Sequence, residues 1–219
     1  MNYNTHLELR GKHAAFSASQ SGWTEKSPDE ILEWHIKSYA QTVGTAVHDI
    51  CRKHIKRRFR LTKSAKNEVI LSLVEDYNIP LYVIDGMANF DILYATAMLY
   101  VNDAVSFRMV PEQPVQYSDL FFGTADCITA LDYIFEKKEL RIHDLKTGTQ
   151  PAKMRQLEVY AAETCLEYGL RPEDLNVELR IYQSNEILFH KPTPEELYFR
   201  IDQIKDYDRI INEIRLKEV

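Results

Sequence analysis

The order of periodic segments along the chain is the feature that most limits its fold. Up to about residue 104, apolar residues recur at helical spacing, and the segments 27–41, 43–59, 64–78 and 90–105 are each predicted to contain a helix. From residue 105 onward, short runs of β-branched and aromatic residues alternate with turn residues, which is typical of strands. The chain therefore changes from a helical part to a sheet-forming part near its middle.

The second half predicts a sheet interrupted by helices. Strands are expected within 105–117, 121–131, 139–147, 176–183 and 186–190, with an amphipathic helix at 151–169 and a long helix at 193–216. Helices, then a run of strands, a helix, one or two strands and a final helix indicate an α/β fold, with a central mixed sheet flanked by helices and an N-terminal helical region. We expect one domain over 1–219, with a mainly helical part at 1–104, the sheet core at 105–192 and the C-terminal helix at 193–219.

Three helix ends have clear signals. Ser27 before Pro28 is a good N-cap with proline at the first helical position. Thr193 caps the last helix, with Glu196 completing a capping box. Gly169 is a plausible C-cap of the helix before it.

Composition and charge exclude some classes of protein and leave others open. The net charge is -6, so no global basic excess marks a nucleic-acid binder, although a nuclease needs only a local basic groove. Cys51, Cys127 and Cys165 are few and far apart, which fits free thiols in a reducing compartment. The N-terminus lacks the apolar region of a signal peptide, and no run of about 18 apolar residues could span a membrane. We therefore expect a cytoplasmic protein without membrane contact. The chain ends inside a helical pattern, which leaves open a continuation into a longer protein.

The stretch "RIHDLKTGT", residues 141–149, raises the question of function. Asp144 and Lys146 stand two apart on a predicted strand, so their side chains share one face. Asp126 lies on the preceding strand, and a hairpin turn near 133–138 would bring it close to Asp144. Two carboxylates that close repel each other unless a cation lies between them. The pattern fits either a metal site or acids at a solvated strand edge and turn.

Further motifs give the stretch a family context. "FGTAD", "IHDLKTG" and "QLEVY" resemble the RecB-like branch of the PD-(D/E)XK nuclease superfamily, whose pattern is G-x-x-D, a strand ending in D-x-K and a helix with Q-x-x-x-Y. "GTAVHDI" is similar to the upstream G-x-x-x-H helix motif of this branch, and "MVPEQPV" to a strand that often carries a glutamate. These motifs span residues 44–160, in the family's order. The resemblance implies a restriction-endonuclease-like core.

The resemblance also implies a role for each matched residue. His48, Asp126, Asp144 and the backbone carbonyl of Leu145 would bind Mg²⁺ or Mn²⁺, and Lys146 would position or activate the attacking water. Glu112 would support these ligands or bind a second metal, although an exposed strand edge fits its position equally well. Gln156 and Tyr160 would contact the substrate from one helix face, or would be ordinary helix residues, with Tyr160 packing into the core.

Two neighbouring features carry alternative interpretations. Arg52, Lys53, Lys56 and Arg57 follow His48 on the same helix and could contact DNA phosphates, or could form a solvated helix face. Taken alone, His48 itself would be a helix-surface or core histidine. His143 is expected to point away from Asp144 and to have a structural role.

The resulting interpretation is a phage-type, RecB-like exonuclease that hydrolyses phosphodiesters in DNA recombination, repair or replication. Three scattered cysteines exclude the iron–sulfur cluster of some relatives, and no Walker motif indicates a fused helicase. The expected partner is DNA, with a single-strand-binding or annealing protein and a second copy of the chain as further candidates, in the cytosol of a bacterial host. Two alternatives remain: an inactive DNA-binding or assembly module on the same fold, and a structure-specific endonuclease or ribonuclease.

Overall fold

One mixed sheet of five strands organises the computed structural model, which describes residues 5–9, 11 and 14–217. The strands lie in the order β1-β2-β3-β4-β5, and only β3 and β4 are parallel. This confirms the predicted α/β class with a mixed sheet. The strands are β1 (Val110–Gln116), β2 (Phe122–Ile128), β3 (Glu139–Lys146), β4 (Asn176–Gln183) and β5 (Glu186–His190).

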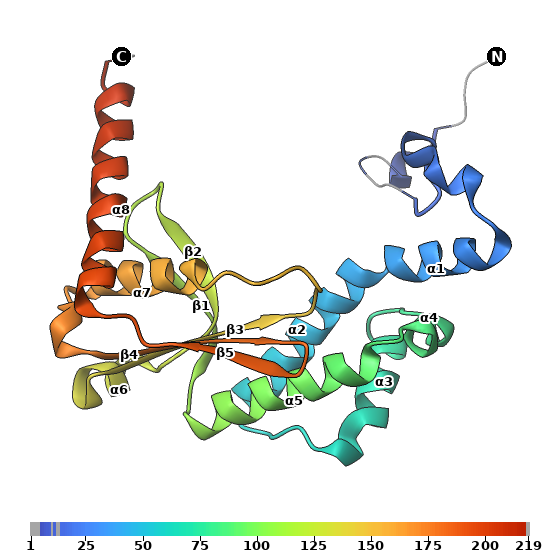
Figure 1. Cartoon of the computed structure of the whole chain (residues 1–219), viewed down its shortest axis with the longest axis horizontal. Helices are drawn as coiled ribbons and strands as arrows, with labels where there is room; N and C mark the ends of the chain where they lie inside the picture. Colours follow the sequence, from blue (N-terminus) through green and yellow to red (C-terminus); the bar gives the residue numbers. More distant parts are fainter. Residues whose placement is uncertain (1–4, 10, 12–13, 218–219) are drawn as a thin grey trace.

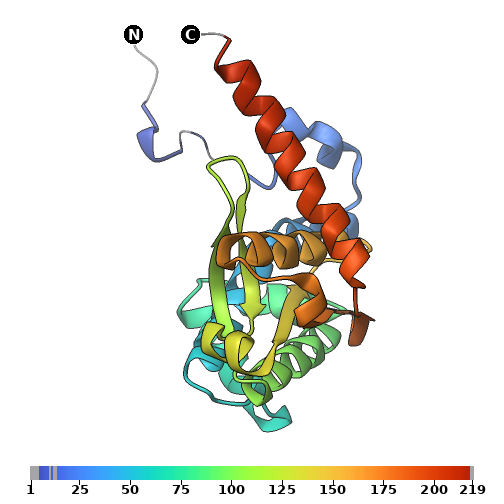
Figure 2. The same ribbon diagram turned by 90° about the vertical axis from the view of Figure 1, so that its left-hand side faces the viewer.

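Helices cover both faces of this sheet (Figure 1). On one face α2 packs against β1 and α5 against β3 and β4, while α7 crosses β1 to β4 on the other. The last helix, α8, packs on α7, and its C-terminal part extends beyond the rest of the molecule (Figure 2). The helices are α1 (Pro28–Ser38), α2 (Ala40–Lys56), α3 (Lys66–Glu75), α4 (Leu81–Gly86), α5 (Phe90–Ser106), α6 (Leu131–Lys137), α7 (Arg155–Tyr168) and α8 (Pro194–Arg215).

Two apolar cores hold these layers together. The larger one joins α2, α3 and α5 to one face of the sheet, where Leu145 and Tyr182 are buried. The second lies between the sheet and α7 and contains Ile142, Leu157 and Ile181. Leu145 and Ile142 are three apart on β3 and therefore face opposite sides, which is why this strand is buried on both faces. Strand β3 is thus the central strand and contributes to both cores.

The predicted helix ends are confirmed. Ser27 and Thr193 both form capping boxes, with Glu30 and Glu196 as the reciprocal partners. The helix α7 ends at Gly169, whose φ of 62° is left-handed and suits a residue without a side chain.

One local prediction needs correction. The connection between β2 and β3 is the helix α6, with Ile134 buried, rather than a hairpin turn near 133–138. The second helix begins at Ala40 and runs through Gly44. The described part of the N-terminal segment contains the short 3-10 helices Leu7–Leu9 and Ala18–Glu25. Two further 3-10 turns lie at Lys63–Ala65 and Pro172–Asp174.

Among the described residues, the helices are all too short or too polar to cross a lipid bilayer.

Candidate metal centre

The strands β2 and β3 pair only over a short stretch at the C-terminal end of β2 and then separate. Bridged pairs join them only at Cys127–His143 and Ile128–Ile142, whereas β3 pairs with β4 over all of Glu139–Lys146. Continuing the same register by one residue would place Asp126 opposite Asp144. We call the opening beyond Cys127 and His143 the fork. Both aspartates predicted from the sequence lie at its apex.

A third carboxylate, Glu112, lies on the other side of Asp126. The β1–β2 register pairs Pro111 with Cys127 and Gln113 with Ala125, which puts Glu112 opposite Asp126, but these two form no bridged pair. Like charges directly opposite each other destabilise a sheet. Glu112 also has a φ of 53°, a left-handed conformation that costs energy in a strand and is often found at functional sites. The sheet is therefore irregular where its acids gather.

Asp126 connects α2 to β3 through one carboxylate oxygen. Its Oδ2 lies 3.5 Å from the Nδ1 of His48 and accepts a hydrogen bond of 3.0 Å from the backbone N–H of Leu145. His48, Glu112 and Asp126 each offer one ligand atom, and these three atoms lie within 4.8 Å of one another. A nitrogen and two carboxylate oxygens form a donor set that first-row divalent metals accept.

Asp144 takes part in a separate chain of contacts. It is 3% exposed, and the Nζ of Lys146 lies 3.0 Å from its Oδ1 and 2.9 Å from its Oδ2, although only Oδ1 has hydrogen-bond geometry. The same ammonium donates to the Oε1 of Gln156 at 3.0 Å, and the amide of Gln156 donates to the Tyr160 hydroxyl at 3.4 Å. A chain of hydrogen bonds thus joins the D-x-K motif to the Q-x-x-x-Y motif.

The surroundings of Asp126 disfavour its ionised form. Burial, followed by the nearby Asp144 carboxylate, raises the pKa of Asp126 to about 6, and Glu112 adds a smaller contribution. His48 and the Leu145 N–H act in the opposite direction, but they do not balance the rise. A divalent cation would favour the ionised form of Asp126 and remove this repulsion.

The predicted ligands are therefore brought together only in part. His48 and Asp126 lie in the donor set as expected, and its third ligand atom comes from Glu112 rather than from Asp144. Asp144 as a ligand, and the Leu145 carbonyl as another, remain predictions, because the carboxylate of Asp144 faces Lys146. Three carboxylates share one lysine in the fork, and this surplus of acids fits a site built for a cation.

Two glycines have roles that sequence patterns alone did not reveal. A Cβ added at Gly123 would lie 2.7 Å from the ring of Tyr160, and one added at Gly44 would lie 2.7 Å from the Oγ1 of Thr147. Gly123 therefore lets α7 approach β2, and Gly44 lets the loop after β3 approach α2. Gly123, in the G-x-x-D motif, makes room for Tyr160 of the Q-x-x-x-Y motif. Gly44, in the G-x-x-x-H motif, makes room for Thr147, which follows Lys146 of the D-x-K motif.

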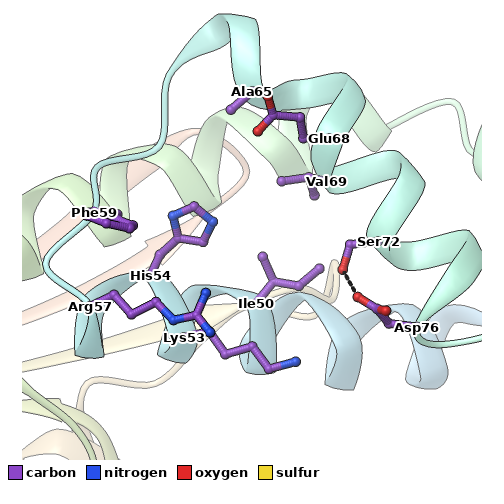
Figure 3. A pocket seen from close by; sticks show the side chains of 10 residues that line it. All are labelled: Ile50, Lys53, His54, Arg57, Phe59, Ala65, Glu68, Val69, Ser72 and Asp76. Carbon is purple, nitrogen blue, oxygen red and sulfur yellow. Dashed lines mark hydrogen bonds between the residues drawn. The ribbon is translucent and has the colours of Figure 1, made fainter.

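The predicted basic residues divide between two sides of α2. Arg52 and Lys56 follow His48 at i+4 and i+8, so they lie on the side of the metal centre. The guanidinium of Arg52 contacts Asp49, which is the main cause of its raised pKa, and Glu112 contributes to the same rise. Lys53 and Arg57 instead line a cavity of about 280 Å³ between α2 and α3 (Figure 3). A role in DNA binding remains a prediction for all four.

His143 lies on the opposite face of β3 from Asp144, as predicted. Its ring is fully buried against Phe107 and Tyr182, and Nδ1 lies 3.2 Å from the Tyr182 hydroxyl. Burial is the main cause of a pKa well below its usual value. Nearby lies a second group of charged residues, which we call the arginine cluster: Asp103, Glu139, Arg141, Glu178 and Arg180.

Comparison with protein families gives a match. The model of a family described as "Protein of unknown function (DUF2800)" matches residues 13–190, which include the whole fork and the five strands. No curated protein and no solved structure matches the chain.

Proposed function

We propose that this chain, which belongs to the DUF2800 family of proteins of unknown function, is a metal-dependent deoxyribonuclease with a RecB-like PD-(D/E)XK core. The single observation that carries the proposal is the fork itself. Three carboxylates and a histidine from four elements gather where β2 and β3 stop pairing, with one lysine beside them. The proposed core is the finer form of the α/β fold described above.

The residues of the fork would divide the chemistry between them. His48, Glu112 and Asp126 would hold Mg²⁺ or Mn²⁺, with Asp144 as a further candidate ligand. The ion would neutralise charge on the scissile phosphate and lower the pKa of the attacking water. Because magnesium binds preferentially to oxygen, the two carboxylates would supply most of the affinity.

Lys146 would act on the water or on the phosphate. Its ammonium is held between the Asp144 carboxylate and the Gln156 amide, at 3.0 Å from each, so its position is set by two elements of the fold. A preorganised cation stabilises charge that develops during the reaction without further rearrangement. Gln156 and Tyr160 would then position Lys146, and their exposed edge would contact the substrate strand.

The basic side of α2 supports DNA as the substrate. Arg52 and Lys56 continue from His48 toward the end of the helix, so a phosphate backbone could follow the helix away from the fork. Such contacts do not read sequence, and we expect cleavage with little base preference. End processing in recombination, repair or replication, in the cytosol of a bacterial host, is the proposed setting.

A second candidate function is a DNA-binding or assembly module that does not turn over. The observation that favours it is the ion pair between Lys146 and Asp144, which leaves Asp144 outside the donor set. On this alternative Asp144 and Lys146 form a structural ion pair at a strand edge. Binding of DNA without cleavage at any metal concentration would support it.

The deciding experiment is cleavage of end-labelled linear double-stranded and single-stranded DNA with Mg²⁺, Mn²⁺ or EDTA. Wild type is compared with Asp126→Asn and Lys146→Ala, and with Asp202→Asn, an exposed acid on α8, as the matched control. Metal-dependent cleavage by wild type and Asp202→Asn, with loss in the other two, supports the nuclease. Equal activity in wild type and all three variants contradicts the assignment. Covalently closed DNA as a further substrate separates an exonuclease from an endonuclease.

A further inference from the structure

A second feature adjoins the fork and has no part in the chemistry above. A cavity of about 450 Å³ lies beyond the end of β3, walled by the bend between α1 and α2, the connection from α4 to α5, and the loop Thr147–Thr149. Its volume falls in the usual range for pockets that take small molecules, about 300–1,000 Å³. The cavity is therefore large enough for a ligand of its own.

The cavity lies next to the metal centre. Gly44, in its wall, precedes His48 by one helical turn, about 6 Å along the axis, and Thr147 directly follows Lys146. Gly44 and Thr147 are in close contact, because a Cβ on the glycine would lie 2.7 Å from the threonine hydroxyl. The loop that leaves β3 passes beside α2 before it returns to α7 (Figure 1). A group bound in the cavity would be within a nucleotide's reach of the fork.

The lining has little free charge. Glu33 and Lys37 are its charged side chains among the described residues, and they form an ion pair with each other at 2.6 Å. No unpaired cation in this lining is therefore available to hold a phosphate. The ligand that fits should be uncharged where it contacts the wall.

The remaining lining combines apolar surface with a few polar groups. Ile36, Val43 and Met87 supply the apolar part, and methionine adapts well to flat rings. The Asn89 amide and the Thr147 hydroxyl can each donate and accept hydrogen bonds. A nucleobase, which is flat and uncharged with donors and acceptors on its edges, matches this chemistry.

We propose that the cavity receives one unpaired nucleoside of the substrate strand, next to the phosphate that is cut. This inference rests on the proposed nuclease function. It adds a binding site for a base of the substrate, whereas the fork would bind the phosphate. Contacts remote from the reacting bond would fix the position of the scissile phosphate. An unpaired base enters such a pocket without the cost of leaving a duplex stack, so single-stranded or frayed ends would be preferred.

The test uses the full chain with Ala88→Trp, which fills the cavity from an exposed position in its wall. Asp85→Trp, exposed on α4 but outside the lining, is the matched control. Thymidine and deoxyadenosine binding is measured by calorimetry in EDTA, with deoxyribose 5-phosphate as a probe that lacks the base. KM and kcat are measured on linear single-stranded DNA with Mn²⁺, and metal binding by thermal shift.

We expect both nucleosides to bind wild type and Asp85→Trp, and deoxyribose 5-phosphate not to bind. Ala88→Trp should weaken nucleoside binding and lower kcat/KM by about ten-fold, equivalent to about 1.4 kcal/mol, with metal binding unchanged. If Ala88→Trp does not fold, Asn89→Ala takes its place, with the same expected direction of change.

The outcomes separate this inference from the nuclease proposal. DNA cleavage by wild type, with Ala88→Trp equal to wild type in nucleoside binding and kcat/KM, would overturn the nucleoside site alone. Nucleoside binding that Ala88→Trp abolishes, in a protein that cleaves no DNA, would support the site and overturn the nuclease. Tighter binding of deoxyribose 5-phosphate than of thymidine would overturn the inference by showing a phosphate site.

Discussion

The fork and the arginine cluster are two charged regions built on the same strand, and they differ in how their charges are balanced. In the arginine cluster, Arg180 contacts Glu178 at 2.8 Å and Asp103 at 2.7 Å, and Arg141 pairs with Glu139. In the fork, Asp126 faces two other carboxylates and has a pKa raised to about 6. The acids of the arginine cluster pair with guanidinium groups, whereas in the fork Lys146 pairs with Asp144 and Asp126 lies beside the imidazole of His48.

Strand pairing differs in the same way. On the side of the arginine cluster, β3 is bridged to β4 over its whole length, while on the side of the fork only two residue pairs join it to β2. A continuous ladder satisfies the backbone and leaves no room for a ligand. An interrupted ladder exposes backbone groups, one of which, the Leu145 N–H, is satisfied by the Asp126 side chain. We infer that the first region serves stability and the second serves binding.

The largest expected effect is on catalysis. Replacing Asp126 with Asn, or Lys146 with Ala, should reduce metal-dependent DNA cleavage by at least about a hundred-fold, because each removes a group that stabilises charge in the reaction. Initial rates on end-labelled DNA provide the measurement. Arg180→Ala is the contrasting variant: its rate per folded molecule should equal that of wild type, and a comparable loss there would remove the distinction between the two regions.

The second effect is on stability in the arginine cluster. Arg180→Ala should lower the free energy of unfolding by about 2–4 kcal/mol, since it leaves Glu178 and Asp103 partly buried without their main partner. Urea denaturation of the metal-free protein would measure it. Arg209→Ala, in an exposed pair on α8, is the control and should change stability by less than about 1 kcal/mol.

Metal should stabilise the fork. Mn²⁺ or Mg²⁺ at about 100 times its dissociation constant should add roughly 2.7 kcal/mol to the free energy of unfolding. The effect should be lost in Glu112→Gln and Asp126→Asn and retained in Arg180→Ala. Thermal unfolding with increasing metal concentration is the measurement. Unchanged stabilisation in Asp126→Asn would place the metal elsewhere in the protein.

The metal-free fork should also make stability depend on pH. Asp126 binds its proton more tightly when folded, with a pKa of about 6, than when unfolded, with a pKa of about 3.9. Its stabilising contribution is therefore complete below pH 3.9 and is lost as the pH rises through 6, by at most about 3 kcal/mol. In EDTA, Asp126→Asn should be more stable than wild type at pH 8 but not at pH 4. Parallel pH profiles for the two proteins would contradict the raised pKa.

The smallest effect concerns the glycines beside the fork. Gly123→Ala should cost about 1–3 kcal/mol and reduce cleavage, because its methyl group would displace the ring of Tyr160. Gly22→Ala is the control, since a Cβ there would lie 3.9 Å from the ring of Trp34, an ordinary van der Waals contact. Comparing the two by denaturation and by rate separates loss of packing from a general effect of alanine.

Local sequence signals predicted most elements of the fold. Capping at Ser27 and Thr193 and the left-handed Gly169 depend on neighbours in sequence, so their patterns were sufficient. The helix α6 was missed because its seven residues are too few for a clear helical period, and burial of Ile134 against the sheet determines its structure. Short elements take their conformation from what they pack against.

The candidate site was predictable in its members but not in its contacts. The spacing of Asp144 and Lys146, and the position of Asp126 on the previous strand, place these residues near one another from sequence alone. The sequence could not show that Glu112 would join His48 and Asp126 while Asp144 turned to Lys146. The left-handed backbone at Glu112 accompanies a gap in the pairing of β1 with β2, a feature of long-range contacts.

The sequence by itself determined the α/β class, the order of the elements and the set of chemically competent side chains, because periodicity and residue type are local properties. Only the tertiary structure decided where β2 and β3 separate, which acids lack a counter-charge and where a cavity opens beside Lys146. Those features depend on distances between residues far apart in the chain. They arise from packing, in which Gly44 and Gly123 allow helices and loops to approach the fork.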